Sequence, residues 1–179
     1  MLTPYCVYPT DAPAPPFSSP PLFQEDVKAD RPRARRYYQH ALEASPDHVP
    51  TLLRLGSLVT RAMENVGPGG GSHPDVSRGR ELLSRAVAIS PDDADAHFYY
   101  AKFLEGPAGL SEAAAHHYQR CVEIDPHHVL ALQGLGELRL MQGDENGAEE
   151  LLLRALDVDP SEAPCKDDFI ELLRAVRRG

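Results

Sequence analysis

The stretch from Val129 to Pro160, VLALQGLGELRLMQGDENGAEELLLRALDVDP, holds one complete structural unit of the chain. Apolar or small residues recur at helical spacing in both of its halves; they are Leu132, Leu135, Gly136, Leu138 and Leu140, then Ala148, Leu151, Leu152, Ala155 and Leu156. Gly143 and Asp144 interrupt the pattern, and Pro160 ends the second half because proline lacks a backbone donor. The stretch predicts a helix, a tight turn and a second helix.

The same unit recurs on the N-terminal side of this stretch. Each copy closes with a small residue followed five positions later by proline, as Ala41 and Pro46, Ala86 and Pro91, Cys121 and Pro126, and Ala155 and Pro160. The last three prolines are 35 and 34 residues apart, whereas 45 residues separate the first two. The sequence therefore predicts a repeated helix pair with an insertion of about 11 residues in one copy.

These residues resemble the tetratricopeptide repeat (TPR), whose pattern stands here as Leu132-x2-Leu135-Gly136-x2-Arg139, then Ala148-x3-Leu152, Ala155 and Pro160. Arg139 occupies a place where the family usually has an aromatic residue, and Leu138 and Leu140 are expected to fill that space. The resemblance implies an all-α, right-handed α-solenoid of antiparallel helix pairs. About three full TPR units are expected, with an N-terminal half unit before them and a C-terminal capping helix after them.

Two regions follow from this reading: a proline-rich arm, residues 1–30, and a TPR solenoid domain, residues 31–178. The glycine-rich insertion falls at about residues 66–76, and it lacks the Gly-Lys-Ser/Thr of a phosphate loop. Asp93 and Ser111 are expected to cap helices, and the apolar face of residues 161–178 is expected to close the core. Close helix contacts are expected to bury Ala101, Ala114, Cys121, Gly136, Ala148 and Ala155.

Prolines at positions 4, 9, 13, 15, 16, 20 and 21 exclude regular helix or sheet in the arm and favour an extended form. This composition fits a disordered tail equally well. The arm also carries more large apolar side chains than a solvated linker needs, and these could dock on a partner or on the solenoid: Tyr5, Tyr8, Phe17, Leu22 and Phe23.

Charge and composition narrow the classes of partner and compartment. The net charge is −9, and the one basic cluster, Arg31 to Arg36, is short, so nucleic acid is not expected as a partner. No apolar run reaches the ~18 residues of a membrane span, and the N-terminus shows no pattern of a targeting signal. We expect a cytoplasmic protein without membrane insertion, with reduced cysteines and with a cytoskeletal or ciliary assembly as one setting.

No arrangement of residues in the sequence indicates catalysis. His116-His117 and His127-His128 are the only concentrated metal ligands, but neighbouring helical residues point about 100° apart. No nucleophile and base share a recognisable context, and the acidic residues fall in turns and on outer faces. We expect no enzyme activity, no cofactor and no metal.

Stacked helix pairs create a concave surface, and in the TPR family the first helices line it. The resemblance places there Leu53, Ser57, Thr60, Phe98, Lys102, Glu105, Leu130, Gln133, Glu137 and Leu140, with Asp167, Glu171 and Arg174 closing the end. This mixture of apolar and charged residues suits a peptide or helix of a partner protein. The positions at which one TPR subclass grips the carboxylate of chaperone tails hold Leu53, Ser57, Tyr99, Leu130 and Gly134, so chaperone tails are disfavoured.

Two functions remain open from the sequence. The chain is either a non-catalytic adaptor that binds a partner segment reversibly through the groove and the arm, or a structural subunit built permanently into a larger cytoskeletal, ciliary or organellar complex. In both cases the partner is a protein.

Overall fold

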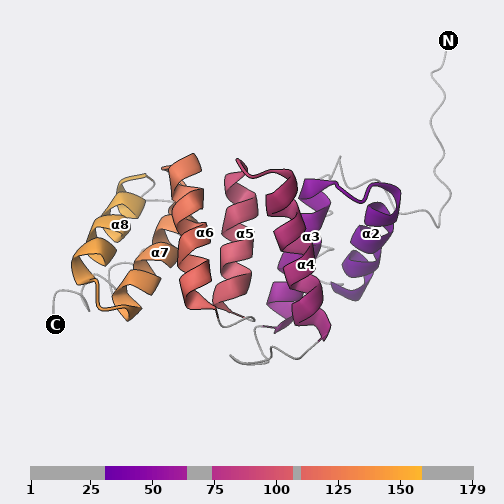
Figure 1. The fold of residues 1–179 in the computed structure, drawn as a ribbon, viewed down its shortest axis with the longest axis horizontal. Helices are drawn as coiled ribbons and strands as arrows, with labels where there is room; N and C mark the ends of the chain where they lie inside the picture. Colours follow the sequence, from indigo (N-terminus) through magenta and orange to yellow (C-terminus); the bar gives the residue numbers. More distant parts are fainter. Residues whose placement is uncertain (1–30, 64–73, 107–109, 159–179) are drawn as a thin grey trace, which may run out of the picture.

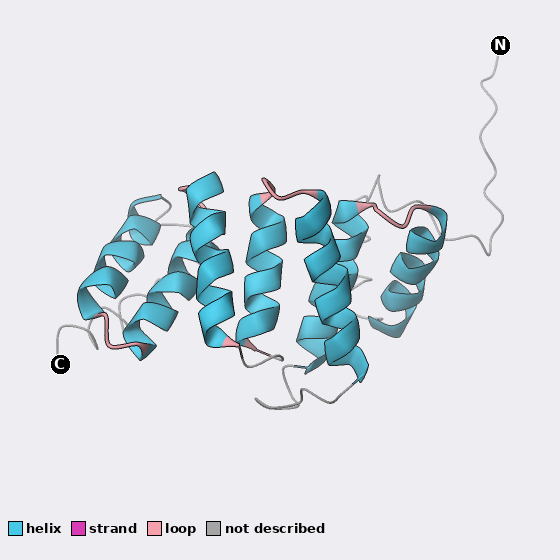
Figure 2. Ribbon diagram, in the orientation of Figure 1, coloured by secondary structure: helices cyan, strands magenta, loops and turns pink. Residues whose placement is uncertain are grey.

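The computed structural model describes residues 31–63, 74–106 and 110–158 of the chain. Helices and short turns make up these ranges, and no strand occurs within them (Figure 2). The helices are α2 (Arg31–Ala44), α3 (Val49–Met63), α4 (Pro74–Ile89), α5 (Ala94–Glu105), α6 (Ser111–Ile124), α7 (Val129–Met141) and α8 (Glu145–Val158).

The helices stand side by side in a row that follows the chain from α2 to α8 (Figure 1). Helices α3 and α4, α5 and α6, and α7 and α8 form antiparallel pairs, while α2 packs on α3 as a half unit. Helix α5 also contacts α3 and α7, whereas α4 and α6 do not contact each other in the described part of the chain. The first helices of the pairs, α3, α5 and α7, therefore form an inner row, and the second helices lie on the outer side of the solenoid.

A continuous core runs through the pairs and uses the small residues of the repeat. Its large members include Leu52, Leu83, Phe103, Leu132 and Leu152, each at most 1% exposed. The predicted burial of small residues at helix contacts is confirmed for Ala101, Ala114, Cys121, Gly136, Ala148 and Ala155. Leu138 is buried and Leu140 is half-buried, while Arg139 reaches Asp144 at 3.7 Å instead of entering the core.

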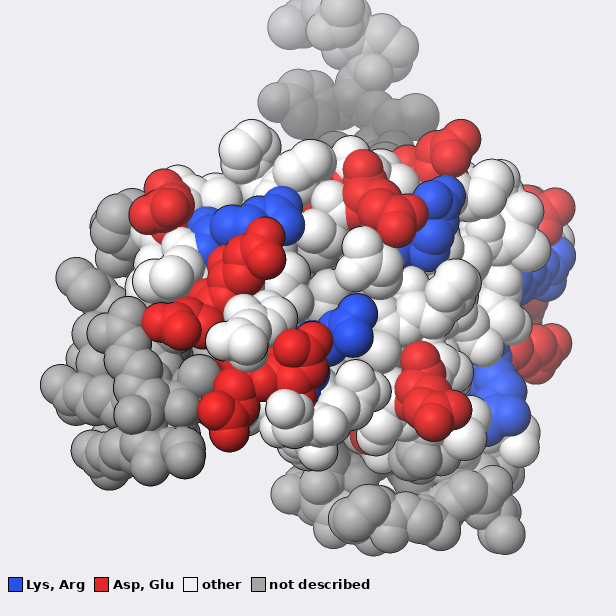
Figure 3. All heavy atoms as spheres, turned by 60° about the vertical axis from the view of Figure 1, so that its left-hand side comes forward, with Lys and Arg blue, Asp and Glu red and all other residues white. Residues whose placement is uncertain are grey.

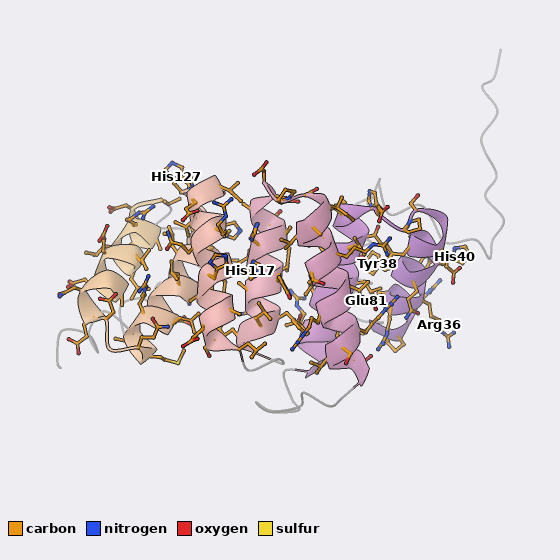
Figure 4. The ribbon with its side chains drawn as sticks, viewed as in Figure 1. Arg36, Tyr38, His40, Glu81, His117 and His127 are labelled. Carbon is orange, nitrogen blue, oxygen red and sulfur yellow. The ribbon has the colours of Figure 1, made fainter. Side chains whose placement is uncertain are left out.

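The half unit α2 turns one face toward the solenoid. Figure 4 shows Tyr38 lying between α2 and the next helix pair, whereas Arg36 and His40 point away from it. Tyr38 is 7% exposed, so it belongs to the core. Arg35 donates to Asp75 of α4 at 3.3 Å, and this hydrogen bond raises the pKa of Arg35.

Turn chemistry explains most helix ends. Gly143, with φ +81°, allows the sharp reversal between α7 and α8, because this conformation disfavours any residue with a Cβ. Asp144 then accepts from the Gly147 backbone N–H at 3.0 Å. The prediction for Asp93 is confirmed, since its carboxylate accepts from Asp95 and Ala96 at the start of α5.

Two expected boundaries were wrong. Ser111 is the first residue of α6 rather than its cap, because the chain turns at Leu110, whose backbone N–H donates to Leu104 O at 2.8 Å. Helix α4 begins at Pro74, so residues 74–76 belong to the helix and not to the insertion. Proline suits a first helical position because the backbone donor there has no partner in the helix.

Several predictions lie outside the described residues. They are the arm, residues 1–30, most of the glycine-rich insertion, and the capping helix, residues 161–178. Of the three cysteines only Cys121 is described, and it is buried and free. None of the helices in the described ranges is long and apolar enough to cross a membrane.

Candidate functional site

A cavity of about 290 Å³ opens on the inner row of helices. Its lining comes from the first helices of three successive pairs, with one residue added from α6. The lining residues are Ser57, Thr60 and Arg61 of α3, Phe98, Tyr99, Lys102 and Glu105 of α5, Tyr118 of α6, and Leu130, Gln133, Gly134 and Glu137 of α7.

Helical spacing explains why these residues converge. On α5 the lining positions are 98, 99, 102 and 105, and on α7 they are 130, 133, 134 and 137, so each set forms one face along its helix. The opposite stripes carry Phe103 and Leu104 of α5 and Leu135 and Leu138 of α7, which are at most 2% exposed. The apolar stripes hold the helices together and leave the mixed stripes facing the cavity.

Tyr118 reaches the cavity from the second helix of its pair. The ring is 1% exposed, and its Oη donates to Glu105 Oε2 at 2.8 Å. Gly134 makes room for it, because a Cβ there would lie 2.7 Å from Tyr118 Cζ. Burial, and then the charges of Glu105 and Glu137, raise the pKa of Tyr118 well above its usual range, so the hydroxyl keeps its proton.

Aromatic rings form one wall of the cavity. Phe98 lies with its ring centroid 5.3 Å from Tyr99, 6.2 Å from Tyr118 and 4.8 Å from His128. Leu130 adds an aliphatic side chain that is 42% exposed. The wall offers rigid apolar area at low cost in side-chain entropy.

Charges of both signs surround the aromatic wall. Gln133 Nε2 donates to Glu137 Oε1 at 2.8 Å, and both residues are half-buried. Lys102 and Arg61 are exposed at the rim. Figure 3 is turned so that the side of the molecule with α7 and α8 comes forward. On the face it shows, acidic patches alternate with smaller basic ones.

The structure brings most of the predicted groove residues together. Those that line the cavity are Ser57, Thr60, Phe98, Lys102, Glu105, Leu130, Gln133 and Glu137. Leu53 is instead a core residue at 7% exposure, and half-buried Leu140 lies beyond the lining. Asp167, Glu171 and Arg174 lie outside the described ranges. A binding role for any of them stays a prediction.

Four lining residues were not predicted for the groove: Arg61, Tyr99, Gly134 and Tyr118. The first three neighbour predicted positions, because a face that spans more than a narrow stripe includes adjacent residues. Tyr118 carried no such signal, since it belongs to the outer helix and enters through the space above Gly134. Only the packing of the two helices reveals it.

The histidines outside the cavity do not assemble a metal site in the described part of the chain, where no group of three or more suitable ligands occurs. His97 and His117 form a pair with 3.0 Å between their Nδ1 atoms, and Figure 4 shows His117 beside α5. Burial raises the pKa of the Cys121 thiol to about 12, with the charges of Asp125, Asp95 and Asp93 adding to the effect. The thiol is therefore protonated and a poor nucleophile at neutral pH.

Comparison with known proteins agrees with this architecture. The family model described as tetratricopeptide repeat matches residues 108–166. The TPR repeat-containing protein PA0015 of Pseudomonas aeruginosa is 39% identical over 71 residues, which are 39% of this chain and 66% of that protein.

Solved structures show the same fold at low sequence identity. The thermophilic TPR protein TTC0263 of Thermus thermophilus superposes with a TM-score of 0.71 at 14% identity, covering 84% of this chain and 76% of its own. MamA gives 0.62 at 18% identity, covering 87% and 86%. YrrB, described as a TPR protein with an unusual peptide-binding site, gives 0.60 at 20% identity, covering 88% and 69%. The chain therefore contains tetratricopeptide repeats, which the family model places at residues 108–166, and its described helices share the fold of solved TPR proteins.

Proposed function

We propose that this chain is a non-catalytic interaction module whose inner helices bind a peptide or helix of a partner protein. The observation that carries the proposal is the cavity across α3, α5 and α7, which combines an aromatic wall with charges of both signs. Side chains of a peptide can use both kinds of contact along one extended surface. YrrB, a TPR protein of the same fold, is described by its peptide-binding site, which supports the proposal by analogy alone.

An enzymatic function is disfavoured by the chemistry of the described residues. The hydroxyl of Tyr118 keeps its proton although it is bonded to Glu105, and the buried thiol of Cys121 is protonated. The hydroxyls of Ser57 and Thr60 donate to backbone carbonyl oxygens and not to a base. Partners other than proteins are also disfavoured, since the acidic chain suits neither nucleic acid nor an anionic surface. Permanent incorporation into a larger assembly would use the same surface.

Capture of partners by the intact chain, with and without substitutions in the cavity, tests the proposal. We expect Phe98→Ala with Lys102→Glu to abolish capture, because central aromatic anchors dominate the energy of an interface. Lys102→Glu alone should change the amount of partner captured while leaving thermal unfolding unchanged, since Lys102 is exposed and lines the cavity. This single variant separates binding from stability, because Phe98 also packs against the core.

A matched control variant makes the same two kinds of substitution on the outer helix α4. Ile89→Ala with Arg80→Glu removes an exposed apolar side chain and reverses an exposed charge on α4. Proteins that remain bound to this variant and are lost from the cavity variants support the proposal. Partners that survive both cavity changes would place the binding surface elsewhere on the chain.

A further inference from the structure

We propose that the cavity selects partner segments that carry a lysine or arginine, whose cationic group lies between Glu105 and Glu137 beside the hydroxyl of Tyr118. This inference rests on the proposed function and adds the chemistry of the ligand. Hydrogen bonds, charge and burial within the cavity support it.

Hydrogen bonds leave acceptors facing the cavity. Tyr118 uses its only proton on Glu105, so its oxygen can act toward a ligand as an acceptor. Glu137 accepts from the neutral amide of Gln133 and keeps further lone pairs. The space beside Gly134 holds the hydroxyl in place between the two helices. A ligand that approaches this end therefore meets acceptors on three side chains.

The two carboxylates lack a cationic partner among the described residues. No Lys, Arg or His nitrogen of these ranges forms an ion pair with Glu105 or Glu137, and their hydrogen-bond donors are a hydroxyl and an amide. Both charges raise the pKa of Tyr118, which indicates that both lie near the same oxygen. A ligand cation beside that oxygen would be attracted by both carboxylates.

Burial decides which sign of ligand charge is favoured. Glu105 and Glu137 are half-buried, whereas Lys102 and Arg61 are exposed. Charges shielded from water interact more strongly than exposed ones, and an exposed ion pair contributes little. The rim cations would therefore attract an acidic ligand weakly, while the carboxylates would hold a basic one more firmly. Phe98 and Leu130 can cover the aliphatic stem of such a side chain.

The charge requirement also argues against the arm as the occupant. Residues 1–27 contain no Lys, Arg or His, so this segment brings no basic side chain. We assign the site to a segment of another protein.

Selection from a display library of random 12-residue peptides on the intact chain supplies a probe. We expect the selected peptides to be enriched in Lys or Arg at one position, and to lose binding to Phe98→Ala. Replacing that basic residue by Met should weaken binding about tenfold, which is the loss of one partly desolvated charge pair. Added salt should weaken the parent peptide more than the Met peptide.

A double-mutant cycle tests where the basic group of the peptide lies, with binding affinities measured by isothermal titration calorimetry. Glu137→Gln and Glu105→Gln should each weaken the parent peptide, and neither should weaken the Met peptide further. Glu112→Gln on α6 is the matched control, because it removes one exposed carboxylate away from the cavity. Equal losses for both peptides would overturn the inference, since they would indicate a purely structural effect.

The remaining outcomes separate this inference from the proposed function. Selected peptides that bind the cavity without a basic residue would overturn the cation site and keep the function. Peptides that ignore Phe98→Ala and Lys102→Glu would count against the function itself. Tighter binding by a synthetic copy of residues 1–27 or 162–179 would overturn the assignment to another protein.

Discussion

His97 and His117 share a hydrogen bond between the two helices of the middle pair. His97 Nε2 lies 3.1 Å from the carbonyl oxygen of Pro91, which can only accept, so this nitrogen carries the proton. His97 Nδ1 is then the acceptor, and His117 Nδ1 is the donor at 3.0 Å. A proton added at His97 Nδ1 would leave two N–H donors facing each other, so this bond needs that nitrogen to stay unprotonated.

We predict that stability falls as the pH drops from 6.5 toward 4. Burial, and then the charges of His97 and His116, lower the pKa of His117 to about 4, so the unfolded chain binds more protons in that interval. The stabilisation is complete above pH 6.5 and is lost as the pH falls through the folded pKa. Urea unfolding of His117→Asn at pH 7.5 and pH 5 should show a smaller change than the parent. His127→Asn, an exposed imidazole, should keep the parental change.

Ala148 lies at a close contact between α7 and α8, where there is little room for a larger side chain. It is fully buried, and its carbonyl oxygen lies 3.6 Å from where a Cβ on Gly136 would stand. We expect Ala148→Leu to overpack α7 against α8 and to cost ~1–3 kcal/mol of unfolding free energy. Ala113→Leu, on the exposed side of α6, should leave the denaturation midpoint nearly unchanged. Equal midpoints for both variants would contradict the assigned helix register.

The residue before the first helix of each pair occupies the same position of the repeat, two residues after the proline that closes the preceding unit. These residues are His48, Asp93 and His128. The two histidines accept a backbone N–H through Nδ1, at Thr51 (3.3 Å) and at Ala131 (3.2 Å), as the carboxylate of Asp93 does for α5. Histidine is not among the residues usually expected to cap a helix, so the sequence pattern indicated only Asp93.

We predict that His48→Ala lowers the free energy of unfolding by ~0.5–2 kcal/mol, the usual effect of losing a capping acceptor. His48→Asp should recover most of that loss, because a carboxylate can accept the same backbone N–H. Chemical denaturation measures both differences. His40→Ala is the control, since His40 points away from the solenoid (Figure 4). Equal losses for His48→Ala and His48→Asp would show that ring packing, and not capping, explains the effect.

The whole molecule is a row of helices in which each contacts its neighbours in the chain or in the inner row. Stability in such an array is close to a sum of local terms, and its ends need cover. Helix α2 has no first helix before it within the described residues. We predict that Leu22 and Phe23 dock on this leading face, whereas Tyr5 and Tyr8 need a partner.

We predict that chymotrypsin cleaves the intact chain slowly at Leu22 and Phe23 and rapidly at Tyr5, whereas the bond after Tyr8 resists this protease because Pro9 follows it. A synthetic peptide of residues 1–30 gives the intrinsic rates at the same bonds, and mass spectrometry follows both. Partner binding should then slow cleavage at Tyr5, because docked segments resist proteases. Cleavage at peptide-like rates throughout, alone and in the complex, would leave a free tail and remove the docking hypothesis.

The pattern of apolar and small residues was enough to predict the helix pairs, their number in the described part of the chain and their core. The physical reason is periodicity, because apolar residues at helical spacing form one face of each helix, and two such faces pack together to exclude water. The residues concerned are Leu132, Leu135, Leu152, Ala148 and Ala155. The resemblance to the TPR family, and not periodicity, assigned Phe98, Lys102 and Glu137 to the groove, and these three residues line the cavity.

The complete lining of the cavity follows from the packing of the helices and could not be predicted from the sequence pattern. Tyr118 lies on an outer helix, and no period in the sequence relates it to Gly134, Glu105 or Glu137; helix packing brings them together across three elements. The same packing withdrew Leu53 into the core and paired His97 with His117. Periodicity reports which face of one helix is apolar, whereas contacts between side chains depend on how neighbouring helices cross and how far each side chain reaches.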